Sequence, residues 1–482
     1  WKTGTDASGL EHAAVRTPSP MKIGTRKTAV LAVASLSSFL TPFMGSAVNI
    51  ALPDIGRAFS LDAVTLNWIS TSYLIASAVF LLPIGRAADI YGKKRFYIGG
   101  LALFTVSSVL AGLSWSPGLL IAARVLQGLG SSMIFGTGVA ILTAAYPPEE
   151  RGSALGVNIA ATYLGLSIGP FAGGVITGAL GWEGVFLATA PLSLAAIALA
   201  LEGIEDDGKG REGEALDVKG SLIYSVSLVA AMYGFSKVTQ PLGVGLTVLG
   251  LLGLALFVTV EKKAQGPVLD IGLMTCNRQF AFSNAAAFIH YSATFALSFL
   301  MSLYLQYVRG MSPEGAGLVL VSQPLVMMAF SPLAGRLSDR VDPRILATLG
   351  MAITCLGLFP LAFLQQDAPL WQILAPLLVI GLGFALFSSP NTNAIMSSVD
   401  RGKQGLASGM ISTMRLTGQA ASMGIVLLLF SCFMGGSRIV PAVFPEFMAS
   451  MRAGFVIFTI LCALGAAASM ARGNREQETQ RR

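Results

Sequence analysis

Charged residues are scarce in this chain of 482 residues. Asp, Glu, Lys and Arg together make up 12% of it, whereas a soluble domain carries about 25%. Apolar residues make up 54%, and the mean hydropathy is +0.69. The apolar stretches divide the whole chain and leave no polar block large enough for a soluble core. A water-soluble protein is therefore excluded, and one integral membrane unit is expected.

Side chains that carry most catalysis and metal binding are also scarce. The chain has 2 histidines, His12 and His290, and 4 cysteines without metal-ligand spacing, so neither a metal site nor a disulfide framework is expected. The stretch from Gly165 to Gly169 matches the G-x-S-x-G pattern of serine hydrolases, which requires a strand-to-helix turn and a nearby histidine. Here it lies in an apolar stretch, and both histidines lie in other segments. We expect no enzyme and no cofactor.

Two further absences limit the energy source and the partners. No G-x-x-x-x-G-K-[ST] loop occurs, so ATP is not expected to drive the protein directly. The formal net charge is +7, but the basic residues lie in short loops between apolar stretches. That distribution is typical of membrane topology rather than of nucleic-acid binding. We expect a gradient of ions or solutes as the energy source and no nucleic-acid partner.

Apolar stretches of about 20 residues, the length that crosses a bilayer, recur along the chain. They predict an all-α integral membrane protein with 14 transmembrane helices, arranged as two six-helix bundles plus two inserted helices. The expected spans are Thr28–Ile50, Thr65–Ile84, Phe96–Ser114, Leu119–Val139, Gly152–Ala179, Gly184–Leu201, Ser221–Ser236, Gly243–Val260, Phe280–Val308, Gly317–Pro332, Ile345–Leu364, Leu370–Ser389, Gly405–Phe433 and Ala453–Ala471.

The loops between these spans divide the chain and orient it. The sequence opens on Trp1, and Met21, which precedes basic residues and an apolar run, is the expected natural start. Lysines and arginines gather in alternate loops, which predicts that both termini are cytoplasmic. The predicted parts are a cytoplasmic tail at 1–27, a six-helix bundle at 28–201, a charged connector at 202–220, the inserted pair at 221–260, a second connector at 261–279, a C-terminal six-helix bundle at 280–471 and a cytoplasmic tail at 472–482.

The two bundles repeat each other in sequence. Gly85-Arg-Ala-Ala-Asp89 recurs as Gly335-Arg-Leu-Ser-Asp339, in both cases in a loop on the predicted cytoplasmic side. The glycine spacing that begins at Gly152 recurs from Gly405. Duplicated bundles of membrane helices are typical of secondary transporters, in which the substrate binds near the midplane between the halves.

Three motifs follow one another along the first bundle. They are Gly85-Arg-Ala-Ala-Asp89-Ile-Tyr-Gly92-Lys93-Lys94-Arg95, Arg124-Val-Leu-Gln127-Gly128-Leu-Gly130 and Gly165-Leu-Ser-Ile-Gly169-Pro170-Phe-Ala-Gly173-Gly174. In this order they resemble the loop, buried-arginine and antiporter motifs of the major facilitator superfamily, in particular of its fourteen-span drug:proton antiporter branch. The resemblance extends over nearly the whole chain from Lys27 onward. It implies a multi-pass secondary transporter of the plasma membrane that exports amphiphilic small molecules by alternating access.

The resemblance also implies roles for the motif residues. Gating loops would comprise Gly85, Asp89, Gly92, Lys93, Lys94 and Arg95, repeated at Gly335, Asp339 and Arg340. An Asp can cap a neighbouring helix, and the loop could latch one conformation; the alternative is a solvated loop that only sets topology. In the antiporter motif the small residues permit close helix packing and Pro170 permits bending, so structural packing and gating both remain open.

One position departs from that branch of the family. The branch usually carries an Asp in the outer half of the first span, and Met44 stands at the matching position. Its depth is similar to that of Arg124, so the carboxylate of the implied acid–arginine pair is missing. Ordinary proton coupling is therefore in question, and the coupling ion could be a proton or another ion.

Charged groups within the predicted spans are few, and at the bilayer centre each costs about 2.5–3.5 kcal/mol on insertion scales. The spans contain Arg124, Arg415 and His290 and no Asp or Glu. The arginines either serve a ligand or are structural and bonded to carbonyl groups. His290, with an ordinary pKa of about 6.5, is either a coupling group or a hydrogen-bonded core residue. Further cavity candidates, each of which could equally form helix-to-helix hydrogen bonds, are Asn49, Gln127, Tyr163, Asn284, Gln323, Asn391 and Asn393.

Three functions remain open on the sequence. The resemblance favours an exporter of drugs and other amphiphilic small molecules. The two intramembrane arginines favour an exporter of anionic metabolites or lipids. A sensor that binds a solute without moving it lacks an output domain, because the polar connectors are short and highly charged. The expected partners are a small-molecule substrate, a coupling ion and the lipid bilayer, and the expected state is a monomer.

Overall fold

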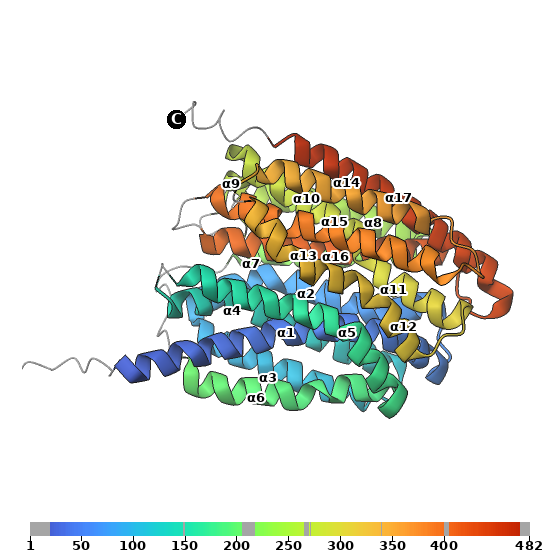
Figure 1. Ribbon diagram of the computed structural model, residues 1–482, viewed down its shortest axis with the longest axis horizontal. Coiled ribbons are helices and arrows are strands. Elements are labelled where there is room, and N and C mark those ends of the chain that lie inside the picture. Colours follow the sequence, from blue (N-terminus) through green and yellow to red (C-terminus); the bar gives the residue numbers. More distant parts are fainter. Residues whose placement is uncertain are drawn as a thin grey trace, which may run out of the picture.

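The computed structural model is a bundle of long helices that run side by side (Figure 1). It describes residues 20–147, 150–204, 217–264, 269, 271–338, 340–399 and 404–472. Within these ranges every regular element is helical, and 13 helical runs are long and apolar enough to cross a membrane. The predicted all-α membrane fold is confirmed.

The first bundle contains six helices. The first of them begins at Pro20 and extends past the predicted span at both ends. We call the side of the bundle where it begins the terminus side and the other side the opposite side. The bounds are α1 Pro20–Ala58, α2 Ala63–Tyr91, α3 Lys93–Gly112, α4 Pro117–Ala145, α5 Arg151–Leu187 and α6 Thr189–Gly203.

Helices α5 and α6 follow each other with only Ala188 between them, so the run from Ala154 to Gly203 counts as one of the 13, but it crosses the bundle twice. Gly181 has a φ of 77°, in the left-handed region that favours glycine, and it interrupts the helical backbone of α5. Trp182 packs against Phe59 at the opposite side, with ring centroids 5.6 Å apart and the rings tilted by 59°. The carbonyl of Ile204, by contrast, accepts a hydrogen bond from Lys94 at the terminus side. This reversal favours the predicted count of 14 spans, which stays a prediction.

The inserted pair lies at the junction of the two bundles. It comprises α7 (Val218–Ser236) and α8 (Pro241–Glu261). The Tyr224 hydroxyl of α7 donates to the Ala78 carbonyl of α2 at 3.1 Å. The Ser431 hydroxyl of the second bundle donates to the Ser236 carbonyl of α7 at 2.9 Å. Helix α8 is mostly exposed: 17% of its most apolar 18-residue stretch is buried. It therefore presents an apolar surface to lipid.

The second bundle is more broken than the first. Helices α10, α11 and the π-helical turn η1 form one membrane run, and α12 and α13 form another. The bounds are α9 Ile271–Cys276, α10 Arg278–Thr294, α11 Ala296–Leu303, η1 Tyr304–Val308, α12 Pro313–Leu320, α13 Ser322–Ser338, α14 Pro343–Leu361, α15 Leu370–Ser397, α16 Gln404–Phe433, the short turn η3 Pro441–Val443 and α17 Phe444–Met470.

The sequence repeat is also a structural repeat. Helices α3 and α4 approach closely where a Cβ added to Gly100 would lie 2.9 Å from the carbonyl oxygen of Gly130. Helices α14 and α15 do the same in the second bundle, where a Cβ on Gly350 would lie 2.6 Å from the carbonyl oxygen of Gly383. Only glycine allows backbones to approach this closely. Corresponding helix pairs of the two bundles therefore pack through corresponding glycines.

The two bundles are joined on the opposite side. Helix α5 crosses α12 so closely that a Cβ on Gly317 would lie 2.3 Å from the Pro170 carbonyl oxygen. The backbone N–H of Ala63 donates to the Ser437 carbonyl at 3.1 Å. Three side chains of α11 and η1 donate to carbonyls of α1: Ser302 to Asn49 at 2.6 Å, Gln306 to Ile50 at 2.9 Å and Tyr307 to Pro53 at 3.1 Å. These contacts close the bundle on that side.

Candidate functional site

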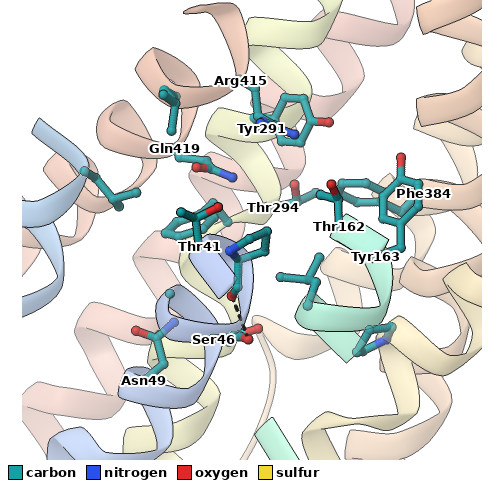
Figure 2. Close-up of a pocket in the computed structure, with 18 of the residues that line it drawn as sticks. Thr41, Ser46, Asn49, Thr162, Tyr163, Tyr291, Thr294, Phe384, Arg415 and Gln419 are labelled. Carbon is teal, nitrogen blue, oxygen red and sulfur yellow. Dashed lines mark hydrogen bonds between the residues drawn. The ribbon is translucent and has the colours of Figure 1, made fainter. Parts of the chain in front are cut away.

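A cavity lies between the two bundles near their mid-depth (Figure 2). The centre of a water molecule can occupy about 120 Å³ of it, which is room for on the order of ten waters. Helices from both halves line it: Thr41, Pro42, Gly45, Ser46, Asn49, Tyr73, Leu74, Phe135, Thr162, Tyr163, Leu166 and Pro170 from the first bundle, and Tyr291, Thr294, Phe295, Ser298, Gln323, Pro324, Met327, Phe384, Arg415, Leu416 and Gln419 from the second.

The middle of α1 makes room for this cavity. Pro42 has no backbone N–H and interrupts the hydrogen-bond ladder of the helix. A Cβ added to Gly45 would meet no atom within 4 Å, so the absent side chain leaves open space. The hydroxyl of Ser46 donates to the Pro42 carbonyl at 3.0 Å (Figure 2). A proline, a glycine and small polar residues thus form one wall.

Arg415 is the one cationic side chain among the lining residues, and none of those residues is an Asp or Glu. Its guanidinium carbon lies 5.1 Å from the ring centroid of Phe135, within the range of a cation–π contact. Figure 2 shows Arg415 and Gln419 on the same stretch of α16, turned toward the cavity, with Tyr163 and Phe384 across from them. The cavity therefore combines a fixed positive charge, neutral hydrogen-bonding groups and aromatic surface.

Of the candidate residues predicted from sequence, Asn49, Tyr163, Pro170, Gln323 and Arg415 line the cavity. Asn49 accepts a hydrogen bond through its side-chain oxygen from Ser70 at 3.0 Å. The hydroxyl of Tyr163 is hydrogen-bonded to that of Ser388 and so joins α5 to α15. These residues agree in position with the predicted cavity, and their roles stay predictions.

Arg124 and Gln127 lie beside the cavity rather than in its wall. Arg124 is buried and donates through Nε to the Ile69 carbonyl at 3.0 Å and through its terminal nitrogen to Gln127. The Gln127 amide donates to Ser108 at 2.7 Å. The ring of Tyr73, which does line the cavity, covers the Arg124 guanidinium at 4.3 Å. This arrangement favours the structural interpretation of Arg124, linked to the cavity through Tyr73.

His290 is enclosed by aromatic side chains behind the cavity wall. Its ring centroid lies 4.0 Å from that of Phe387 and 4.8 Å from that of Phe384. It is fully buried, and neither ring nitrogen has a hydrogen-bond partner among the described residues. The hydrogen bonds that a satisfied core histidine would make are therefore not found among the described residues. Phe384 separates the ring from the cavity, which it lines.

Asn391 and Asn393 are not among the residues that line the cavity. The Asn391 amide donates to the Ser283 carbonyl of α10 at 3.2 Å. The Asn393 amide donates to the Ser338 hydroxyl of α13 at 3.1 Å. Both contacts are helix-to-helix hydrogen bonds, the alternative stated for these residues.

The first loop motif lies on the terminus side, and the prediction that Gly85 to Asp89 form a loop is wrong: these residues belong to the last turns of α2, and Lys93 begins α3. Gly92, with a φ of 105°, separates the two helices, and Lys93 forms an ion pair with Asp89 at 2.9 Å across it. Lys94 donates to the end of α6, and Arg95 is exposed. The motif therefore ties three helix ends together, and its role as a latch stays a prediction.

The repeated loop motif is described in part. Gly85 packs beside α4, because a Cβ on Gly136 would lie 3.4 Å from the Gly85 Cα. Its counterpart Gly335 lies beside α15, where a Cβ would be 3.0 Å from the Ser389 hydroxyl. The backbone N–H of Arg340 donates to the Leu337 carbonyl at 3.1 Å. Asp339 lies outside the described residues.

The glycines of the antiporter motif pack in two directions. Three of them face α1: an added Cβ would lie 2.3 Å from the Phe39 carbonyl oxygen at Gly165, 1.8 Å from the Ser46 hydroxyl at Gly169 and 2.8 Å from the Ala47 Cα at Gly173. Gly174 faces α12, where an added Cβ would lie 2.5 Å from the Pro313 carbonyl oxygen. The motif thus holds α5 against its own bundle and against the other one.

Sequence reasoning missed most of the neutral lining, including Thr41, Thr162, Tyr291, Thr294 and Gln419. One signal could have found Gln419, because residues four apart share a helix face and Arg415 was already a candidate. The threonines and tyrosines carry no such signal, because single hydroxyls are common in membrane helices.

Comparisons with known proteins agree with this geometry. The chain matches the family model described as Major Facilitator Superfamily over residues 34–423 and 283–482. It is 30% identical over 391 residues to the riboflavin transporter RibZ of Clostridioides difficile, covering 81% of this chain and 85% of that one. It is 31% identical to the cephamycin export protein CmcT of Amycolatopsis lactamdurans, covering 94% of each chain. It is 31% identical to the multidrug resistance protein Stp of Mycobacterium tuberculosis, over 79% of this chain and 71% of that one.

Solved structures share the fold at lower sequence identity. A bacterial homologue of the human lysosomal transporter Spinster, in an inward-facing and unoccupied conformation, superposes with a TM-score of 0.66 at 16% identity, over 94% of this chain and 98% of that one. A D-xylose-proton symporter superposes with a TM-score of 0.62 at 14% identity, over 92% of this chain and 97% of that one.

Proposed function

The chain belongs to the major facilitator superfamily, and from that premise we propose that it is a gradient-driven exporter of amphiphilic small molecules. Members of the family are transporters, and a multi-pass membrane protein follows from the helices described above. The observation that carries the proposal is the mixed polar and aromatic cavity between the two bundles. A site at that position can face either side of a membrane in turn as the bundles move against each other.

Alternating access requires that the cavity be closed on one side at a time. The described contacts between the bundles support a state closed on the opposite side, where α1 is bonded to α11 and η1 and where α5 crosses α12. Two further side-chain contacts between the bundles, Tyr163 with Ser388 and Ser167 with the Pro324 carbonyl at 3.1 Å, lie at the level of the cavity, because Tyr163 and Pro324 line it. We infer that the terminus side is the open side and, from the loop charges, that it is cytoplasmic.

The direction and the class of substrate are proposed from the relatives and the lining. Two of the relatives are named for cephamycin export and multidrug resistance, which supports export of drug-like compounds. Another is named for riboflavin, so the relatives do not share one substrate. Aromatic walls with dispersed hydrogen-bonding groups suit amphiphilic molecules of varied shape.

A second candidate class, neutral or anionic amphiphiles, including anionic metabolites or lipids, is favoured by the charge of the cavity. Arg415 has no carboxylate partner among the lining residues. A guanidinium presents a fixed fork of donors that suits a carboxylate or phosphate. A lipophilic cation would find no acid there to replace its lost hydration. We therefore propose that anionic and neutral compounds are carried better than cations.

The coupling ion is proposed as a proton or another ion. Met44, which stands where the family's branch usually has an acid, is fully buried in the core. His290, the one histidine among the described residues, is then the candidate coupling group beside the cavity wall, although it is enclosed in this state. We propose a monomer in the plasma membrane with both termini cytoplasmic.

Flux in proteoliposomes tests this function. The purified protein is reconstituted, a proton or a sodium gradient is imposed, and the uptake of fluorescent amphiphiles is followed. We expect saturable uptake of the fluorescent amphiphiles that depends on the proton or the sodium gradient. Binding without any flux would instead support a solute sensor.

A further inference from the structure

One charged side chain on the terminus side is buried without a partner. Arg472 follows the last turn of α17 and is 3% exposed. None of its three guanidinium nitrogens has a hydrogen-bond partner among the described residues. A guanidinium keeps its proton in proteins, and an unpaired charge in such a place is strongly unfavourable. The position therefore calls for an anion.

The surroundings of Arg472 add positive charge. Arg278 lies beside it, because its Nε donates to the Ala471 carbonyl at 3.1 Å. Helix α10 begins there behind the Asn277 cap, and α14 begins behind the Asp342 cap. Both helices pack against α17, so two helix N-termini with their partial positive charges are directed toward this corner.

Asp342 neutralises only a small part of this positive charge. Burial lowers the pKa of Arg472 to about 10, and the Asp342 carboxylate acts in the other direction. The same carboxylate already accepts the backbone N–H of Arg344 at 2.9 Å as the cap of α14. With a pKa near 10, Arg472 is charged at neutral pH, and one capping carboxylate stands against two arginines and two helix N-termini.

The corner also lies at the edge of the lipid-facing surface. Ile345, in the first turn of α14, is 59% exposed, and Met470, in the last turn of α17, is 57% exposed. Apolar side chains so exposed at a helix end mark the boundary between the hydrocarbon and the headgroups. A phosphate carried by a lipid would stand at this level.

We propose that Arg472, with Arg278 and the N-termini of α10 and α14, forms a binding site for the phosphate of an anionic phospholipid headgroup. The phosphate oxygens accept the unpaired N–H groups of Arg472. The acyl chains lie along the exposed apolar residues of α14 and α17. The lipid thereby joins the first and last helices of the second bundle, α10 and α17, to α14.

Lipid retention and thermal unfolding of the purified full chain test this site. Native mass spectrometry counts bound phosphatidylglycerol, and unfolding is followed with phosphatidylglycerol, with phosphatidylcholine or with inorganic phosphate alone. In Arg472→Leu we expect the loss of one retained phosphatidylglycerol and affinity weaker by about fivefold or more, the effect of one basic residue at an anionic surface. Arg472→Lys keeps the charge and should retain part of the effect.

The matched control is Arg452→Leu, an exposed arginine near the opposite end of the same helix. It should leave the phosphatidylglycerol effect unchanged. In lipid-free neutral detergent, Arg472→Leu should unfold at the same or a higher temperature than the parent, because an unpaired buried charge has been removed. A merely structural arginine would instead lower the unfolding temperature with and without lipid.

Three results would overturn the assignment. One is equal retention of phosphatidylglycerol by the parent and Arg472→Leu. Another is equal stabilisation by phosphatidylcholine, which would mean that the site does not distinguish an anionic headgroup from a zwitterionic one. The third is full stabilisation by inorganic phosphate alone, which would assign the site to a soluble anion instead of a lipid.

Discussion

Replacing Arg415 removes the one cationic side chain of the cavity lining. The informative change is Arg415→Met, because methionine keeps much of the length and the apolar contact with Phe135 while it deletes the charge. The control is Gln419→Met, which introduces the same side chain one turn away and removes a neutral group. Arg415→Lys separates charge from geometry, because it keeps the charge and loses the planar fork.

The size of the effect follows from the direct contact between the guanidinium and the anionic group. Hydrogen bonds to a charged group contribute about 1.5–3 kcal/mol, net of the hydration that both groups lose. Arg415→Met should then weaken the binding of an anion about 30-fold and leave a neutral analogue within a few-fold. It should strengthen the binding of a cation. Arg415→Lys should weaken the anion by about tenfold, for the loss of one charge-assisted hydrogen bond of about 1.5 kcal/mol.

The assay is competitive transport in proteoliposomes with matched anionic, neutral and cationic amphiphiles of the same ring system. Inhibition constants are measured for the parent and for the three variants, each reconstituted at equal protein density. Gln419→Met should change all three compounds alike. The charge reasoning is refuted if saturable transport of cations exceeds that of anions in the parent and survives in Arg415→Met.

Four further substitutions test other parts of the structure. Asp89→Asn removes a surface ion pair worth about 0–1 kcal/mol, so folding should stay intact while flux at normal expression falls. Asp339→Asn should lower flux less, because the second motif lacks the basic run of the first. Unchanged flux in both variants would contradict the proposed role of the motif as a latch. Any proton dependence of transport should vanish in His290→Ala, whereas an unchanged pH profile would place coupling at an acid near the membrane surface or in another ion. Gly317→Val places a Cβ 2.3 Å from the Pro170 carbonyl oxygen. It should abolish flux by preventing closure on the opposite side, while the protein still binds substrate. Normal flux would show that α5 and α12 need not meet.

Much of the fold could be predicted because a bilayer imposes helix length. The second inserted helix was expected at 243–260 and is found at Pro241–Glu261. The break between 179 and 184 contains Gly181, where the backbone reverses. Helix ends were predicted less well, as at α1, which begins at Pro20 and ends at Ala58. Hydropathy marks where a helix enters the membrane and carries little information about turns that continue beyond it.

The site was predicted less completely. The sequence predicts how deep in the membrane a residue lies, but it does not predict which way each helix is rotated about its axis. Arg415 and His290 were both expected at depth, yet Arg415 faces the cavity and His290 is enclosed behind Phe384. In a soluble helix the polar face would distinguish them. In a membrane helix both the lipid face and the packed face are apolar, so the pattern does not give the rotation.

The most direct test of the central claim is accumulation of a substrate against its concentration gradient by the reconstituted protein. A fluorescent amphiphile is presented at equal concentration inside and outside proteoliposomes, and a proton or sodium gradient is then imposed. The account predicts net, saturable accumulation that collapses when an ionophore dissipates the effective gradient and that is absent in Gly317→Val. Tight binding with no accumulation under any gradient would contradict it.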